Sequence, residues 1–405
     1  MATYTREESN VIREQHDERT ARLDACLGEK TVRSFAEKKV AVIGLGALGG
    51  PMLNYLSMLG IRQFLLVDPG IVEPANLGNQ SFDAVHVGML KVEARTLQIK
   101  RVNPRAHVGV FAERLEMLGR GTLWDCDLVV SCLDNLATRV LLNEICCGMR
   151  IPWVDAATDG SGKFMIGRVA SFGAHPDAPC FVCAFGHEQL AQAVTSERVG
   201  CPSWWNDPAP SRPTLSIPPE CGIIAGIQCI EAIKRLRGDL SARISTEMFI
   251  DLDQMKLHSI TLQHNPKCLN SHQAFGELVS LSADTSIGAT LNKLSEQGGS
   301  DASIMLHGKS FITHVRCSTC GRHVPVGKID LALTLENTRC PCGQFLAPNP
   351  FSRHEVLDAK NASPFLDRSW KEIGLPLEDI ISGVAADRHV DYRVVDRTEQ
   401  SKGSH

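Results

Sequence analysis

Three glycines and one aspartate are the first residues in this chain whose types and spacing predict chemistry. Gly44, Gly46 and Gly49 lie in the run GLGALGG, between a short apolar stretch and a helical pattern, and Asp68 ends a second apolar stretch. Glycines at this spacing allow a tight turn close to phosphate, and the N-terminus of the following helix attracts an anion. The carboxylate of Asp68 can accept hydrogen bonds from ribose hydroxyls. The pattern predicts a nucleotide site; the alternative is a turn that only packs a helix on a sheet.

Further polar residues are expected at the same edge of the sheet. Asn76 and Gln80 lie in the loop after Asp68 and can bind sugar or phosphate, and Lys91 begins a helix and can neutralise phosphate. Asp134 follows a buried apolar stretch and offers a hard carboxylate ligand for Mg²⁺. Each residue alone could be a surface residue or a helix cap. Their convergence on one edge, where ligands of open α/β sheets bind, favours a shared site.

The elements that position these residues alternate between apolar stretches and helical patterns, which predicts an α/β fold. Strands are expected at residues 40–43, 64–67, 108–111, 127–132, 152–156, 163–172, 246–252, 256–262 and 392–395. Helices are expected at residues 88–102, 137–149, 220–236, 285–297 and 370–373. We predict a Rossmann-like doubly wound sheet with an antiparallel extension, followed by a small C-terminal α+β domain with a zinc ribbon.

The length and the net charge of the chain restrict the classes of partner that it can have. The chain has 405 residues and a formal net charge of −4, so no global basic field favours nucleic acid or a membrane surface as partner. The N-terminus is too polar for a signal peptide, and no apolar run is long enough to span a membrane. We expect a cytoplasmic protein with a helical arm (1–38), a nucleotide-binding sheet domain (39–275) with a crossover loop (186–219), and a C-terminal extension (276–405) with a cysteine-rich unit (315–345).

Fifteen cysteines without an export signal indicate a reducing compartment, where clustered cysteines favour metal or thiol chemistry over disulfides. Cys180 and Cys183 have the two-residue gap that lets two thiolates chelate one tetrahedral Zn²⁺. A second set, at the spacing of a zinc ribbon but with a less usual CxC half, comprises Cys317, Cys320, Cys340 and Cys342. Both sites are expected to be closed and structural, and buried free thiols are the alternative.

The motifs, taken in order, resemble those of the HesA/MoeB/ThiF superfamily, to which ubiquitin-activating enzymes belong. They are GLGALGG, VDPGIVEPANLGNQ, VGMLKVEA, SCLDN and CFVC, and the resemblance covers roughly residues 10–275. It implies that ATP adenylates the C-terminal glycine carboxylate of a ubiquitin-like or sulfur-carrier protein. The roles it implies are the phosphate turn for Gly44, Gly46 and Gly49, ribose binding for Asp68, phosphate binding for Asn76, Gln80 and Lys91, magnesium binding for Asp134, and site shaping for Asn135 and Arg139.

The chain departs from this pattern in two places, and an arginine near its N-terminus matches a further feature of the family. Asn79 stands where the family usually places an arginine, so one phosphate contact loses its charge. The family has a second cysteine pair near position 270, whereas here Cys268 is followed by His272, which still completes a chemically sound Cys₃His zinc site. Arg22 lies in a segment that resembles the one from which homologues send an arginine into the partner subunit's site. This predicts a homodimer with shared sites, and a solvated arginine is the alternative.

One cysteine is expected to form a thioester with the activated carrier. Cys201 is the only cysteine in the crossover loop and is the predicted nucleophile, for transfer to a conjugating enzyme. Cys221, at the start of the next helix, is the rival, but its register matches a small packing residue of the family. The second interpretation is MoeB/ThiF-type activation of a sulfur carrier. A non-catalytic scaffold and a nicotinamide oxidoreductase are the alternatives from other classes.

Overall fold

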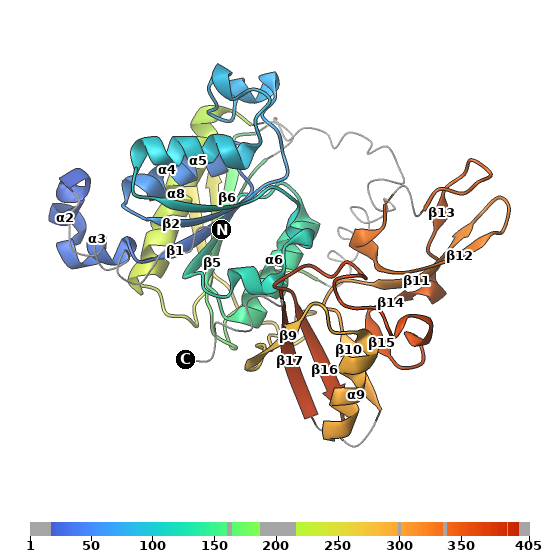
Figure 1. Ribbon diagram of the computed structural model, residues 1–405. Coiled ribbons are helices and arrows are strands. Elements are labelled where there is room, and N and C mark those ends of the chain that lie inside the picture. Colours follow the sequence, from blue (N-terminus) through green and yellow to red (C-terminus); the bar gives the residue numbers. More distant parts are fainter. Residues whose placement is uncertain are drawn as a thin grey trace.

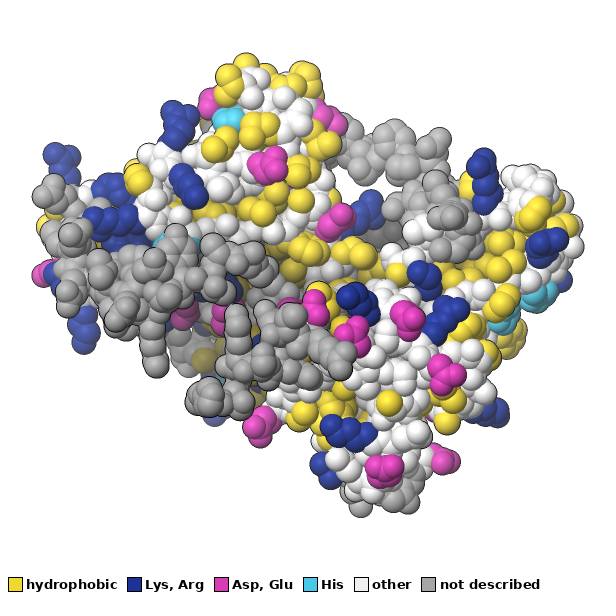
Figure 2. Space-filling view, in the orientation of Figure 1, with side chains coloured by type: hydrophobic (Ala, Val, Ile, Leu, Met, Phe, Trp, Pro, Cys, Tyr) yellow, Lys and Arg dark blue, Asp and Glu magenta, His cyan; other side chains and the backbone are white. Residues whose placement is uncertain are grey.

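The computed structural model describes residues 18–159, 164–186, 216–298, 301–334, 338–386 and 388–396. Figure 1 shows a sheet domain with a short helical arm on one side and a C-terminal unit on the other. In Figure 2, basic and acidic side chains are interspersed over the visible face, so no single-sign field dominates it. Across the described ranges, we find no helix with the length and apolar character to cross a membrane.

An eight-stranded sheet, in the order β3-β2-β1-β4-β5-β6-β7-β8, forms the first domain. Its strands are β1 (Lys39–Ile43), β2 (Gln63–Val67), β3 (His107–Phe111), β4 (Leu128–Ser131), β5 (Trp153–Thr158), β6 (Ile166–Phe172), β7 (Thr246–Asp251) and β8 (Lys256–Thr261). β3, β2, β1, β4 and β5 pair in parallel, whereas β6, β7 and β8 add in antiparallel pairs. The predicted doubly wound sheet with an antiparallel extension is confirmed.

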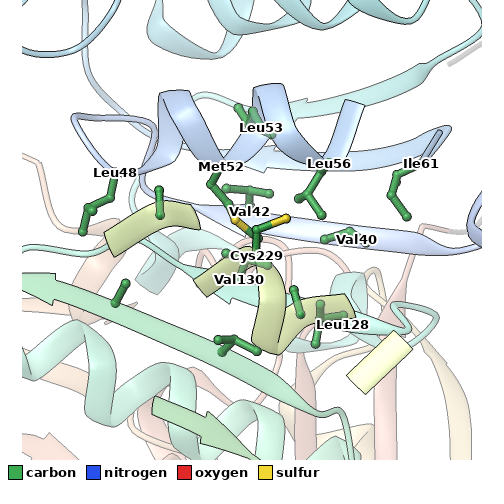
Figure 3. Packing of buried hydrophobic residues seen from close by; sticks show 14 of the residues in the cluster. Val40, Val42, Leu48, Met52, Leu53, Leu56, Ile61, Leu128, Val130 and Cys229 are labelled. Carbon is green, nitrogen blue, oxygen red and sulfur yellow. The ribbon is translucent and has the colours of Figure 1, made fainter. Parts of the chain in front are cut away.

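Helices cover both faces of this sheet, which is why its central strands are apolar on both sides. One face carries α4 (Gly49–Met58), α5 (Lys91–Val102) and α8 (Pro218–Arg237), and the other carries α6 (Leu136–Met149). Figure 3 shows Met52 and Leu56 of α4 packed against Val40 and Val42 of β1. Cys229 of α8 belongs to the same buried cluster. This packing fixes the N-termini of α4 and α5 at the carboxyl edge of the strands.

From residue 18 onwards, the N-terminal arm contains two short α-helices, α2 (Ala21–Leu27) and α3 (Glu29–Phe35). Gly28 joins them with a φ of +86°, a backbone conformation that glycine adopts without strain. α3 buries Val32 and Phe35, whereas α2 has no buried residue. α2 therefore projects from the domain, as Figure 1 shows.

The described residues of the C-terminal unit form two further sheets and one α-helix. A five-stranded sheet has the order β15-β10-β16-β17-β9, and a smaller sheet joins β12, β11 and β13, with β14 also paired to β11. The elements are β9 (Leu278–Ser282), α9 (Ile287–Gly298), β10 (Ala302–Met305), β11 (Phe311–Cys317), β12 (His323–Ile329), β13 (Leu346–Ala347), β14 (Arg353–His354), β15 (Val356–Asp358), β16 (Ile380–Ala385) and β17 (Arg388–Val395). The expected helix at residues 370–373 is wrong, because these residues form turns.

Buried polar contacts join the C-terminal unit to the sheet domain. The N–H of Gly121 donates to the carbonyl oxygen of Glu378 at 2.7 Å, and the N–H of Arg120 donates to Asp379 Oδ1 at 3.2 Å. Asp379 Oδ2 lies 2.7 Å from Nζ of Lys309, and both side chains are buried. Asp379 therefore connects the backbone of Arg120 in the sheet domain to a buried cation of the C-terminal unit.

Candidate nucleotide site and cysteine clusters

Two of the three glycines in the turn are required by packing. Gly44 has a φ of +89°, and a Cβ there would lie 2.5 Å from the carbonyl oxygen of Cys132. A Cβ on Gly49 would lie 2.3 Å from the carbonyl oxygen of Gly44. Gly46 differs, because the nearest atom to a Cβ would be Gln80 Oε1 at 3.8 Å. The turn combines a fixed backbone with room at Gly46, as the close approach of a phosphate requires.

Asp68 follows β2 directly and is bound to the glycine turn. Its Oδ2 accepts a hydrogen bond from the N–H of Leu45 at 2.7 Å, and its Oδ1 accepts one from the N–H of Gly70 at 2.7 Å. Each carboxylate oxygen can accept a second hydrogen bond, so ribose hydroxyls can still be bound. A Cβ on Gly70 would lie 3.1 Å from Cδ and Cε of Lys91, so the lysine stem lies beside Asp68.

The loop that begins with η2 (Pro74–Gly78) supplies two unsatisfied acceptors. Asn76 Oδ1 accepts a hydrogen bond from the N–H of Glu73 at 2.9 Å. This oxygen therefore stabilises the turn at residues 73–76. Oδ1 of Asn79 and Oε1 of Gln80 are buried and have no hydrogen-bond partner among the described residues. Buried acceptors without donors are costly, so a ligand that donates hydrogen bonds or brings a cation suits this position.

The carboxyl end of β4 presents Asp134 and Asn135. Asp134 is exposed, and its Oδ1 accepts a hydrogen bond from Asn135 Nδ2 at 3.3 Å. Asn135 Oδ1 accepts a hydrogen bond from the N–H of Thr138 at 2.8 Å, which makes Asn135 the N-cap of α6. Asp134 thus lies at the predicted edge with an accessible carboxylate, and magnesium binding stays a prediction.

The side chain of Arg139 points into the protein and binds a buried carboxylate and two backbone carbonyl oxygens. Its Nε donates to Asp155 Oδ1 at 3.0 Å, and its Nη2 donates to the carbonyl oxygens of Ala156 and Leu133. Asp155 is fully buried and also binds Arg168. Asp155 was not among the predicted residues, although a carboxylate inside an expected buried strand indicates a buried cation as partner.

Arg95, on α5, was also missed. Its guanidinium is buried and donates to backbone carbonyl oxygens of the glycine turn and of the loop at Gln80. Phe82 stacks on it, with the ring centroid 3.8 Å from Cζ. An arginine on the apolar side of an amphipathic helix was the available signal, because buried arginines need several acceptors.

The first cysteine cluster joins η6 (Phe181–Ala184) to the segment after β8. Sγ of Cys180 lies 3.7 Å from Sγ of Cys268, and Sγ of Cys183 lies 3.4 Å from Nε2 of His272. The four ligand atoms lie within 4.8 Å of one another. Two thiolates on one tetrahedral Zn²⁺ are about 3.8 Å apart, so the donor set and its spacing fit zinc.

The second cluster lies at the tip of the smaller C-terminal sheet. Sγ of Cys317 lies 3.6 Å from Sγ of Cys342, and Sγ of Cys320 lies 3.5 Å from Sγ of Cys340. These four atoms also lie within 4.8 Å of one another, and Cys320 and Cys342 are exposed. The structure thus brings together both predicted ligand sets, and the ion itself stays a prediction.

The remaining predicted site residues lie apart from the nucleotide edge or outside the described ranges. Arg22 is exposed on α2, where a partner subunit can reach it. Cys201 lies outside the described residues. Cys221 is buried in the first turn of α8, and burial raises the pKa of its thiol. A buried thiol with a raised pKa is a poor nucleophile, so Cys221 is suited to packing.

Comparison with known proteins finds relatives that are described as an activating enzyme or as adenylyltransferases. The "SAMP-activating enzyme E1" of Haloferax volcanii is 27% identical over 248 residues, which are 57% of this chain and 78% of that protein. The "Molybdopterin-synthase adenylyltransferase" of Escherichia coli is 27% identical over 240 residues, 58% of this chain and 87% of that protein. The "Adenylyltransferase and sulfurtransferase MOCS3" of Drosophila willistoni is 27% identical over 213 residues, 52% of this chain but only 43% of that protein. The chain therefore spans less than half of this longer relative.

The fold and the family match agree. The solved structure of Escherichia coli MccB with ATP has a TM-score of 0.50 and 18% identity over 67% of this chain and 82% of that chain, which is a likeness of fold. Residues 18–270 match the ThiF family. This match argues against the nicotinamide oxidoreductase considered from the glycine pattern alone. The turn, the aspartate after β2 and the match over most of the sheet domain lead to one conclusion: the chain belongs to the ThiF family.

Proposed function

We propose that this protein uses ATP and Mg²⁺ to adenylate the C-terminal glycine carboxylate of a ubiquitin-like protein. One observation carries the proposal: Asp68 holds the glycine turn through Leu45, and the buried acceptors of Asn79 and Gln80 lie in the loop that packs over Gly46. Such an edge offers N–H groups to phosphate and acceptors to ribose. The names of the relatives, an activating enzyme and two adenylyltransferases, support adenylation as the activity.

The proposed reaction needs positioning and charge neutralisation. The carboxylate of the carrier attacks the α-phosphorus of ATP, the bond from that phosphorus to the bridging oxygen breaks, and pyrophosphate leaves. The N–H groups of the turn and the ammonium of Lys91 offset the charge on the phosphate oxygens. Mg²⁺ held by Asp134 would neutralise the phosphates further.

Thioester capture is the second step of the proposal. The thiolate of Cys201 attacks the acyl carbon of the adenylate, AMP leaves, and the carrier passes to a conjugating enzyme. The burial of Cys221 supports Cys201 over its rival. The alternative is sulfur-carrier activation without a thioester, which the word sulfurtransferase in the name of the Drosophila willistoni relative supports.

Exchange of radiolabelled pyrophosphate into ATP tests adenylation, with and without carriers that end in glycine. We expect carrier-dependent exchange and a reducible carrier thioester. Cys201→Ala should abolish the thioester and keep exchange, whereas Cys221→Ala should keep both. No exchange with any carrier would favour the non-catalytic scaffold, and exchange without a thioester would favour the sulfur-carrier alternative.

The homodimer is part of the proposal and has its own test. Arg22→Ala and Lys91→Ala should each abolish exchange if Arg22 acts in the partner's site. Mixing the two inactive variants would create dimers with one intact composite site, and we expect about a quarter of wild-type activity to return. No recovery after verified subunit mixing would show that Arg22 does not act across the interface.

A further inference from the structure

We infer that Arg95 is the positioning residue of the nucleotide site, because its buried guanidinium holds the glycine turn and the loop at Gln80 in one arrangement and places a fixed positive charge behind the turn. This inference rests on the proposed function, since it concerns how the same edge binds the phosphates of ATP. It assigns a task to a residue that neither the glycine pattern nor the polar loop residues indicate.

The hydrogen bonds of Arg95 connect two separate loops. Nε donates to the carbonyl oxygen of Leu45 at 3.3 Å, and Nη2 donates to those of Leu45 at 3.2 Å and Gly46 at 3.3 Å. Nη2 also donates to the carbonyl oxygen of Gln80, and Nη1 donates to that of Ser81 at 3.3 Å. One rigid guanidinium therefore fixes four carbonyl groups from the two loops that meet at the site.

The direction of these carbonyl groups has a consequence for phosphate binding. In a trans peptide unit, the C=O of one residue and the N–H of the next point in opposite directions. Because the carbonyl groups of Leu45 and Gly46 point towards Arg95, the N–H groups of Gly46 and Ala47 point away from it. Among the described residues, no acceptor binds either N–H. Arg95 thus directs two free donors towards the open side of the turn.

Arg95 also contributes charge where the sequence otherwise lacks it. Asn79 is neutral, so the loop after Asp68 brings no cation of its own at that position. Burial lowers the pKa of Arg95 to about 9, so its guanidinium stays charged at neutral pH. A Cβ on Gly50 would lie 2.5 Å from Nη2, so this charge lies directly against the first turn of α4. A cation beside a helix N-terminus strengthens the attraction for an anion.

A buried arginine could instead serve stability alone, and this chain contains a matched example. Arg235 on α8 is also buried, and it donates to the carbonyl oxygens of Ser171, Ser241 and Ile244. None of these belongs to the glycine turn or to the loop at Gln80. Replacing each arginine by methionine therefore separates a general loss of stability from a specific loss of nucleotide binding.

The test measures the dissociation constant for ATP with Mg²⁺ by calorimetry, on folded full-length protein. We expect Arg95→Met to weaken ATP binding at least tenfold, Arg95→Lys to weaken it less, and Arg235→Met to leave it within twofold. Unchanged binding in Arg95→Met, an equal loss in Arg235→Met, or a lysine variant no better than methionine would each overturn the inference. If wild type itself does not bind ATP, the proposed function fails instead.

A second variant keeps the test valid if Arg95→Met does not fold. Gln98 accepts a hydrogen bond from Nη1 of Arg95 at 2.6 Å and donates to the carbonyl oxygen of Ser81 at 2.9 Å. Gln98→Leu removes this support and leaves the guanidinium in place. We expect ATP binding to weaken two- to fivefold, and unchanged binding in the folded variant would contradict the positioning role.

Discussion

Oδ2 of Asp68 accepts a hydrogen bond from the backbone N–H of Leu45 at 2.7 Å. The residue expected to bind ribose is therefore attached to the turn expected to bind phosphate. Its other oxygen accepts from Gly70, next to the stem of Lys91. Three segments of the site are thus coupled through one carboxylate, and a change there should affect stability and nucleotide binding together.

Asp68→Asn tests this coupling. An amide has one acceptor oxygen, so its NH₂ group would face either the N–H of Leu45 or that of Gly70, and one donor would lose its partner. We expect the free energy of unfolding to fall by about 1–3 kcal/mol, together with weaker ATP binding. Chemical denaturation and ATP titration measure the two effects.

Asp127 provides the matched control for this substitution. Its Oδ2 accepts a hydrogen bond from the N–H of Lys39 at 2.9 Å, at the amino end of β1 and away from the site. Asp127→Asn should lower stability without changing ATP affinity. A similar loss of ATP affinity in both variants would mean that the effect of Asp68→Asn comes from general destabilisation.

The sheet domain could be predicted from sequence because its signals are local. The glycine turn and the apolar strands on either side of it lie within one short segment, and the structure has them where the pattern indicates. In the C-terminal unit, the predicted helix at 285–297 and strand at 392–395 match α9 and β17. The sheet pairing there could not be predicted, because β9 pairs in parallel with β17, which lies more than 100 residues later in the chain. Trp370 suggested a helix, yet it lies in a turn where its indole Nε1 donates to Thr290 Oγ1 at 3.0 Å.

The candidate site was predictable where residue type alone indicates chemistry. Asp68 and the two cysteine clusters are of this kind, because carboxylates and paired thiols have few structural uses at such spacings. Arg95 could not be assigned, because its partners are backbone carbonyl oxygens that only the folded chain brings near. The resemblance implied site shaping for Arg139, but it could not indicate that the partner of Arg139 is the buried carboxylate of Asp155. Oδ1 of Asn79 shows the same limit, since its burial depends on how the loop packs.

The cysteine clusters predict two zinc ions per chain, with different accessibility. Cys180→Ser should remove one ion and Cys317→Ser the other, as measured by metal analysis of the purified protein. Cys320 and Cys342 are exposed, whereas Cys180 and Cys183 are buried. A chelator should therefore remove the ion of the second cluster first.

Cys147 is the control for the first cluster. It lies on α6, with its Sγ 3.8 Å from Asn143 Oδ1 and in contact with the thiol of Cys180, but it is not one of the four grouped ligands. Cys147→Ser should leave both ions bound. Loss of zinc in this variant, or a single ion in the wild-type protein, would contradict the assigned ligand sets.

The buried pair of Lys309 and Asp379 predicts strong coupling at the junction. Lys309→Met leaves a buried carboxylate without its cation and should lower the free energy of unfolding by about 3–5 kcal/mol. Lys309→Met combined with Asp379→Leu removes both charges and should cost less than the sum of the single changes. Additive losses in this double-mutant cycle would show that the two charges do not interact.

His307 predicts a pH dependence of stability. Burial is the main cause that lowers its pKa from 6.5 to about 4, followed by the charge of Arg120. The other charged groups that act on it are Asp391 and Asp379, which raise the pKa, and Lys309, which lowers it. Its Nε2 lies 2.6 Å from Ser382 Oγ, and the centroid of its ring lies 5.1 Å from the ring centroid of Phe275. The imidazole is therefore neutral in the folded protein at neutral pH.

The sign of the effect follows from proton binding. Between pH 6.5 and 4 the unfolded chain binds a proton at His307 that the folded chain does not, so acid favours unfolding. The contribution of neutral His307 to the free energy of unfolding should be fully present above pH 6.5. It should fall by up to about 3 kcal/mol as the pH drops towards 4. His307→Gln should flatten the plot of unfolding free energy against pH in this window, whereas His258→Gln, at an exposed position on β8, should not. Parallel plots for wild type and His307→Gln would show that another group causes the acid sensitivity.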